Sequence, residues 1–193
     1  MATVTLYPTD DGFLNNISGW YPSEGWLTAK STSSSNTDEC EAYMKFTTVG
    51  AGIGAGDTIN SVTFHWNIYT WNDINFVAYW VFCLDKDNVW DAGGYTWGES
   101  FPPYLPYGIG YGTLNVGGIT LGSTGWNSLV LSSTAIPKSG IFGLGIQAQL
   151  GSNGPSAMFF YDKDTGATSP YIVVDYTPAS TSVPLRTMTG CGL

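Results

Sequence analysis

The most constraining feature of the sequence is a regular alternation of apolar and polar residues over positions 59–68. Successive side chains of a β-strand point to opposite faces, so the apolar residues of this stretch would share one face: Val62, Phe64, Trp66 and Ile68. The polar residues would line the other face: Thr63, His65 and Asn67. The following run, 76–82, is apolar at consecutive positions, as expected for a central strand covered on two sides. Two packed sheets would supply that cover, since their inward faces meet to form a core.

Similar short runs recur along the whole chain, and no helical stripe with a 3.6-residue period reaches a useful length. We predict strands at residues 3–7, 26–29, 42–47, 58–70, 75–84, 112–116, 126–131, 140–149, 157–162 and 171–176. A chain of 193 residues fits one domain, because single β-sandwiches and barrels reach about 200 to 250 residues. We therefore predict an all-β sandwich that occupies residues 1–177 as a single domain, followed by a C-terminal tail, 178–193.

The net charge of the chain limits the classes of partner that it can bind. The formal net charge is −9, and only 6 residues are lysine or arginine. Binding to phosphates needs clustered cationic side chains that displace counterions, so we predict no nucleic-acid partner. Anionic membranes are disfavoured for the same reason, and no apolar run approaches the roughly 18 to 20 residues of a membrane span. We predict no membrane partner either.

The first residues do not read as an export signal. A secretory signal begins with a basic stretch, continues with an apolar run of roughly 7 to 15 residues and ends at a small-residue cleavage site, whereas residues 1–11 alternate like a strand. We expect a protein made in a cytosol without a signal peptide, although its 29 aromatic residues (8 Trp, 12 Tyr and 9 Phe) suit an extracellular binding surface. A virus particle released by lysis would reconcile the two. The alternative is that Met1 and Ala2 were added to a mature secreted domain.

Several short motifs follow one another in a fixed order. A short apolar strand, a glycine-bearing turn and a long strand come first, and a tryptophan pair, a Gly-Trp-Asn-Ser-Leu strand and a closing hairpin follow: residues 43–46, 53–57, 58–64, Trp90 with 96–97, 125–129, and 159–162 with 169–176. In this order the chain resembles the bacterial and archaeal DNRLRE, or disaggregatase-related, β-sandwich module over residues 3–177. The resemblance implies an antiparallel two-sheet β-sandwich, jelly-roll-like and related in shape to carbohydrate-binding modules. It also implies a place in cell-surface or phage structural proteins, without a general catalytic set.

A long loop, 85–111, is the first candidate for a contact surface. It is too long and too rich in Gly, Pro and aromatic residues for an ordinary turn, and loops of this length are usually functional or packed by their own side chains. Exposed rings on a rigid sandwich can stack on sugar faces or anchor a protein contact. We predict Tyr104 and Tyr107, beside three prolines, as the leading partner or glycan contacts, with Tyr95 and Phe101 in the same set. The alternative is that these rings fold back over a sheet as a cover.

Catalysis finds little support in the residue types. His65 is the only histidine, so a Ser-His-Asp or Cys-His arrangement would have to use it. It lies on the polar face of its strand without a second activating feature, and we predict a surface or inter-sheet strand histidine. Glycoside hydrolysis needs two facing carboxylates, and the sequence does not show that any two of the four glutamates converge. We predict a protein that is not an enzyme.

Calcium is a weak candidate, and we predict no cofactor. Asp85, Asp87 and Asp91 offer hard oxygen ligands in one short stretch, but the central glycine and the bidentate glutamate of an EF-hand are absent. A second stretch, Asp-x-Asp-x-Gly at 162–166, is similar, yet the same pattern makes an ordinary turn through Asx hydrogen bonds.

The C-terminal tail is the second candidate for a contact surface. It has no core pattern, and we predict an assembly arm that adds to a sheet edge or lies across an interface, through Val183, Leu185, Arg186, Met188 and Cys191. Packing on its own domain is the alternative. The three cysteines cannot all pair within one chain, and Cys191 is the one placed to cross-link to another chain.

Together these observations favour a non-enzymatic structural or adhesion protein of an extracellular assembly. The most specific form of this hypothesis is a phage virion protein at the particle surface, either a capsid decoration or a fibre component. Its partners would be other virion or fibre subunits in a homo-oligomer, with a glycan as a further ligand. The alternative is a secreted carbohydrate-binding module.

Overall fold

The computed structural model describes residues 1–15, 19–22, 25–31, 40–73, 79–84, 114–115, 124–131, 133, 136–148 and 156–180. Its strands are β1 (Ala2–Leu6), β2 (Asp10–Asn15), β3 (Gly19–Pro22), β4 (Trp26–Ser31), β5 (Cys40–Thr47), β6 (Thr58–Asp73), β7 (Tyr79–Leu84), β8 (Leu114–Asn115), β9 (Gly125–Leu131), β10 (Ile141–Ala148), β11 (Ser156–Tyr161) and β12 (Tyr171–Thr177). Across these ranges the only helix is one 3-10 turn, η1 (Gly166–Thr168). The described part of the chain contains no helix with the length and hydropathy of a membrane span.

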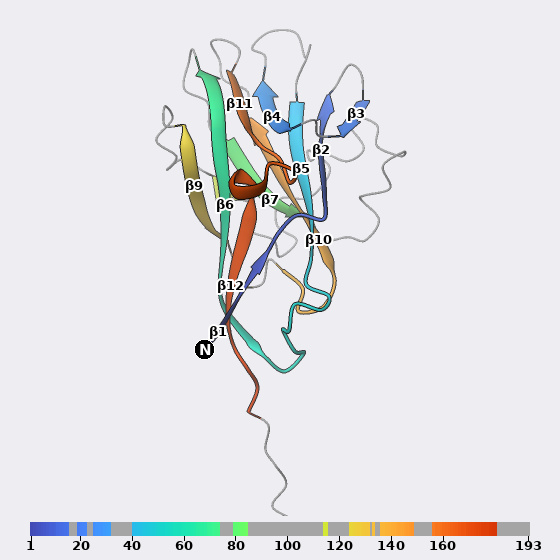
Figure 1. Ribbon diagram of the computed structural model, residues 1–193, viewed down its shortest axis with the longest axis vertical. Helices are drawn as coiled ribbons and strands as arrows, with labels where there is room; N and C mark the ends of the chain where they lie inside the picture. Colours follow the sequence, from blue (N-terminus) through green and yellow to red (C-terminus); the bar gives the residue numbers. More distant parts are fainter. Residues whose placement is uncertain are drawn as a thin grey trace, which may run out of the picture.

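The strands form two antiparallel sheets that pack face to face (Figure 1). In the first, which we call the β6 sheet, β9, β6, β11 and β4 are neighbours in that order, with β12 and β1 extending it. In the second, the β10 sheet, the order is β3, β2, β5, β10, β7 and β8. Within the described ranges, the two sheets are joined at one residue pair of β4 and β5, Lys30 with Cys40.

The chain crosses repeatedly from one sheet to the other. Strands β4, β6, β9 and β11 belong to the β6 sheet, whereas β5, β7, β8 and β10 belong to the β10 sheet. Two packed sheets whose neighbouring strands are not consecutive in the sequence are a feature of jelly-roll-like sandwiches. The predicted all-β, jelly-roll-like sandwich is therefore confirmed. Strands β2 and β3 were not predicted, and they add to the β10 sheet beside β5.

Strand β6 is the central strand of its sheet and is paired along both edges. One of its edges pairs with β12 along residues 58–65 and with β11 along residues 68–73, while the other edge pairs with β9. Strands β11 and β12 thus run end to end beside β6, interrupted by an insert at residues 162–170 that contains η1. This insert holds the start of β12 in place, as described below.

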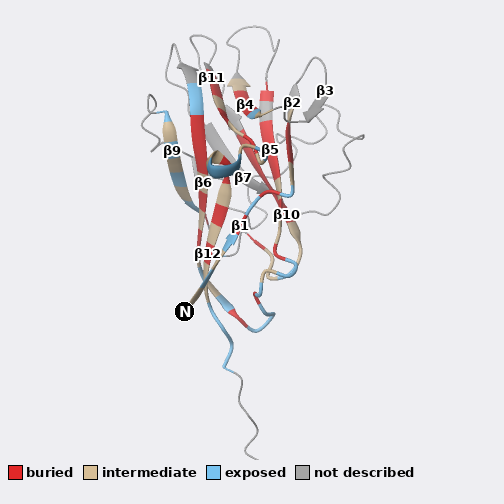
Figure 2. Ribbon diagram, viewed as in Figure 1, coloured by how far each residue is buried: buried red, intermediate tan, exposed pale blue. Residues whose placement is uncertain are grey.

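The core lies between the two sheets, where buried residues follow β5, β6, β10 and β12 (Figure 2). The predicted alternation of β6 is confirmed, because Val62, Phe64 and Trp66 are fully buried and Ile68 is nearly so. The rings of Phe64 and Trp66 stack at 5.0 Å. A second stack, Phe46 on Phe142 at 5.4 Å, lines the β10 sheet.

Candidate functional site

The contact surfaces predicted from the sequence lie outside the described residues. This holds for the long-loop aromatics Tyr95, Phe101, Tyr104 and Tyr107, for the calcium candidates Asp85, Asp87 and Asp91, and for the tail residues Val183, Leu185, Arg186, Met188 and Cys191. The functional roles of these residues stay predictions. The candidate site described here comes from a different part of the molecule, the outer face of the β6 sheet.

Four aromatic side chains meet on that outer face around Tyr171. The Tyr171 ring stacks on His65, with centroids 4.5 Å apart and an interplanar angle of 14°. Trp126 approaches Tyr171 edge-on at 5.3 Å and 63°, and Tyr7 lies at 6.1 Å and 48°. We call Tyr7, His65, Trp126 and Tyr171 the Tyr171 cluster.

Strand register brings these four residues together. Tyr171 and His65 are directly paired across β12 and β6, and residues opposite each other on antiparallel strands place their side chains on the same face. Trp126 comes from β9, where it pairs with Asn67 of β6. The cluster therefore draws on strands that are far apart in the sequence but adjacent in the sheet.

The backbone around the two outer rings is well anchored. Tyr7 follows β1 where the chain crosses between sheets, next to the buried Pro8, and the Thr9 amide donates a 2.7 Å hydrogen bond to the Lys45 carbonyl. Trp126 lies in β9 and is held by the pairing of this strand with β6, where it lies opposite Asn67. Both exposed rings thus start from fixed positions.

The cluster is accessible from solvent. Tyr7 and Trp126 are 59% and 48% exposed, whereas His65 and Tyr171 are half-buried between them. Isolated exposed apolar residues are normal on protein surfaces, whereas contiguous ones mark contact sites. Four contacting rings, two of them strongly exposed, therefore form a candidate contact surface.

The outer face around the cluster is nearly free of charge. Strand register places these further residues on it: Thr3, Thr5, Ser61, Thr63, Asn67, Ser128, Val130, Val173 and Asp175. Among the described residues of these rows, Asp175 is the only charged one. Its carboxylate accepts hydrogen bonds from the Thr3 hydroxyl at 2.7 Å and the Ser61 hydroxyl at 2.9 Å, and these bonds lower the pKa of Asp175.

His65 adds no charge at neutral pH. Burial of the imidazole lowers the pKa of His65 below its usual value, because desolvation disfavours the charged form. Of the two predicted positions, a surface or an inter-sheet strand histidine, the structure shows the first. The cluster thus presents ring faces and neutral hydroxyls, groups that suit non-covalent binding.

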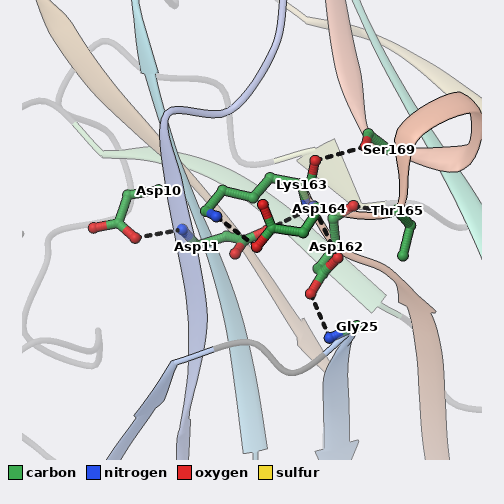
Figure 3. Close-up of polar contacts among 8 residues, drawn as sticks. All are labelled: Asp10, Asp11, Gly25, Asp162, Lys163, Asp164, Thr165 and Ser169. Atoms are coloured by element: carbon green, nitrogen blue, oxygen red, sulfur yellow. Dashed lines mark hydrogen bonds and ion pairs between the residues drawn. The ribbon is translucent and has the colours of Figure 1, made fainter.

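Hydrogen bonds to two buried carboxylates, those of Asp11 and Asp162, hold the insert that precedes Tyr171 (Figure 3), and we call this set of contacts the polar bracket. The fully buried Asp162 accepts a 2.6 Å hydrogen bond from the Gly25 amide and a 3.0 Å bond from the Asp164 amide. The buried Asp11 accepts a 2.6 Å bond from the Lys163 amide. Two carboxylates thus tie the insert to the starts of β4 and β2.

The bracket continues to the start of β12. Ser169 lies two residues before Tyr171, and its hydroxyl donates a 2.8 Å hydrogen bond to the Lys163 carbonyl. Within the insert, the bond from the Asp164 amide to the Asp162 side chain confirms the Asx-turn interpretation of residues 162–166. Asp162 therefore fixes the insert that leads into Tyr171.

The insert also carries the ion pair of Lys163 with Asp164, at 2.6 Å. This hydrogen bond raises the pKa of Lys163. Across the described residues, no group of three or more histidine, cysteine, aspartate or glutamate side chains is arranged to hold a metal ion.

Sequence reasoning missed Tyr7 and Trp126. The signal that could have found them is the alternation itself, since Trp126, Ser128 and Val130 are the exposed positions of β9.

In comparisons with known proteins, no protein-family model and no curated protein matches the chain. The resemblance to the DNRLRE module therefore stays a prediction.

Proposed function

We propose that the protein is a non-enzymatic structural or adhesion protein of an extracellular assembly, and in particular a surface component of a phage virion. The observation that carries this proposal is the Tyr171 cluster, whose neighbouring rows on β1, β12, β6 and β9 hold one charged side chain, Asp175. Contact surfaces are enriched in aromatic residues and depleted of charged residues at their centre. The motif order that resembles the DNRLRE module supports the same function.

In this proposal, attachment and adhesion use separate parts of the molecule. The chain leaves the sandwich beyond β12, at the end where the N-terminus also lies (Figure 1). Strand β12 has 7 residues, so its far end lies about 20 Å from Tyr171 at a rise of about 3.3 Å per residue. The tail would attach the protein to neighbouring subunits, and the Tyr171 cluster would face outward.

The start of the tail is fixed to the sandwich. The Ala179 amide donates a 2.8 Å hydrogen bond to the Asp57 carboxylate, which also accepts a 2.7 Å bond from the Gly54 amide. These bonds, led by that of Ala179, lower the pKa of Asp57. The path of the chain at residues 178–180 is thereby fixed to the sandwich, which suits the start of an attachment arm.

Light scattering on the full chain and on a chain that ends at Ser180 tests the proposal. We expect an oligomer for the full chain and a monomer with an unchanged circular dichroism spectrum for the shortened chain, because an arm contributes to assembly and not to the core. A monomeric full chain, or equal masses for both chains, would contradict the assembly function.

The second candidate is a secreted carbohydrate-binding module that works as a monomer. The exposed rings of Tyr7 and Trp126 favour it, since exposed rings also bind sugars. A monomeric full chain that binds glycan would replace the first candidate with this one.

A further inference from the structure

We infer that the Tyr171 cluster binds a neutral glycan. The glycan would be bound as one soluble polysaccharide strand and not as a crystal surface. This inference rests on the proposed adhesion function. One sugar ring would lie in the corner between Trp126 and Tyr171, and the chain would continue toward Tyr7. Three features of the described residues carry the inference: the charge of the face, the hydroxyls on it and the angles between the rings.

The charge of the face selects a neutral ligand. The chain carries a net charge of −9, yet the rows around the cluster hold a single carboxylate, which two hydroxyls already engage. An anionic ligand would find no cation among these rows. A cationic ligand would be attracted more strongly by the acidic remainder of the surface, since Coulomb attraction grows with local charge. Only an uncharged ligand gains from this face in particular.

The chemistry of the face matches that of a sugar. A sugar ring has apolar C–H faces, which pack on the π-face of an aromatic ring, and hydroxyls around its rim, which need hydrogen-bond partners. Next to the Tyr171 row, the strands carry Thr5, Val173, Thr63 and Val130 in one row, and Ser128 pairs with His65. Thr5 and Ser128 are exposed. Hydroxyl donors thus lie within one row of the exposed rings.

The angles between the rings select a single chain over a crystalline surface. Trp126 stands at 63° to Tyr171, and Tyr7 at 48°. Because neither exposed ring is coplanar with Tyr171, a flat polysaccharide crystal could not touch Tyr171 together with either of them, whereas the tilted pair of Trp126 and Tyr171 would form a corner for one sugar ring. The anchored backbone keeps this corner in place before binding, which lowers the entropic cost of association.

Native affinity electrophoresis of the full chain tests the inference. The gels contain one soluble neutral polysaccharide each, from a panel of β-glucan, galactomannan, xylan, dextran and galactan, with alginate as an anionic comparison. Pull-down on microcrystalline cellulose and on chitin covers the flat surfaces. We expect retardation by at least one neutral soluble polysaccharide, without retardation by alginate and without binding to the crystals.

Substitutions in the cluster locate the site. We expect Trp126→Ala and Tyr7→Ala each to lower the affinity measured from the retardation about tenfold, since stacking of a ligand on a ring contributes on the order of 1 kcal/mol or more. The matched control is Tyr69→Ala, because Tyr69 is 58% exposed on the same sheet but contacts Tyr161 instead of the cluster. Circular dichroism checks that each variant folds, and Trp126→Phe, which keeps a ring, is expected to retain part of the affinity.

Several results would overturn the inference. They are no retardation by any neutral polysaccharide, retardation by alginate alone, binding to crystals alone, and equal effects of Trp126→Ala and Tyr69→Ala. A change in oligomer mass on Trp126→Ala would instead assign the cluster to a protein partner. Light scattering on the same samples separates the two proposals: oligomers without glycan binding overturn only the glycan, and monomers with glycan binding overturn only the assembly.

Discussion

The two faces of strand β6 carry aromatic stacks of nearly the same geometry. On the inner face Phe64 stacks on Trp66 at 5.0 Å and 16°, and on the outer face His65 stacks on Tyr171 at 4.5 Å and 14°. The inner pair is fully buried, whereas the outer pair is half-buried. Ring geometry therefore does not distinguish a core contact from a binding surface in this sheet, because strand alternation produces both.

What distinguishes the two faces is their surroundings. The inner stack is covered by the β10 sheet and stabilises the fold through the apolar area it buries. The outer stack is flanked by the exposed rings of Tyr7 and Trp126, whose apolar area still faces water and is available to a ligand. The same strand thus contributes to stability on one side and, in the proposed function, to recognition on the other.

The largest difference between the faces is expected when each stack loses one ring. We predict that Trp66→Ala lowers the free energy of unfolding by about 3 to 5 kcal/mol, since it removes a fully buried ring and leaves a cavity. His65→Ala on the outer face is expected to cost less than about 1 kcal/mol. Urea titrations of both variants measure the two values, and losses of equal size would contradict the distinction.

A conservative variant separates ring volume from polarity at Trp66. Its indole Nε1 is buried and has no hydrogen-bond partner among the described residues. Trp66→Phe removes this unsatisfied donor together with part of the ring, so we expect it to cost clearly less than Trp66→Ala in the same titrations.

The second largest effect is expected at the polar bracket that positions the outer stack. We predict that Asp162→Ala costs about 3 kcal/mol, because it leaves the amides of Gly25 and Asp164 without their buried acceptor. Near-ultraviolet circular dichroism would also report an altered environment of the cluster, since the insert precedes Tyr171.

The matched control for that variant is the neighbouring exposed carboxylate. The side chain of Asp164 is 66% exposed and pairs only with Lys163 among the described residues. Exposed ion pairs contribute little, so Asp164→Ala is expected to cost about 0.5 kcal/mol or less. A loss as large as that of Asp162→Ala would show that charge in the turn, and not the buried acceptor, holds the insert.

The contrast between the faces also explains what the sequence could and could not predict. Alternation within one strand is local, so the residues of β6 reveal which side is core, and strand β6 was predicted within a few residues of its observed bounds. Strand β2 was not predicted, and it begins with Asp10, Asp11 and Gly12, residue types that are uncommon in strands. It becomes a strand because it pairs with β5, a non-local contact that overrides local preference.

The Tyr171 cluster lay beyond sequence reasoning for a similar reason. Each of its members is visible as an aromatic residue, but only the pairing of β12 with β6 places Tyr171 on His65. No local pattern encodes that pairing, because register is set by how whole strands align. The sequence therefore correctly placed His65 on the face opposite Phe64 and Trp66, whereas its binding candidates lay in the aromatic-rich loop at 85–111 and in the C-terminal tail.

The smallest expected effect concerns the pH dependence of the outer stack. His65 titrates near pH 6.5 in the unfolded chain, and burial lowers its pKa in the folded protein. As the pH falls below about 6.5, the unfolded state takes up the proton first, so stability decreases until the pH passes the folded pKa and the loss is complete. Above pH 7 both states are neutral at His65, and this residue makes no difference.

The variant His65→Gln isolates this effect, because His65 is the only histidine. Carboxylates with lowered pKa, such as Asp57 and Asp175, lose their contribution only near and below pH 4. Between pH 7 and 5 we therefore expect thermal unfolding temperatures to decline more steeply for the natural chain than for His65→Gln. Parallel declines would mean that the imidazole is as well solvated in the folded protein as in the unfolded chain, and that the outer stack with Tyr171 does not shield it from water.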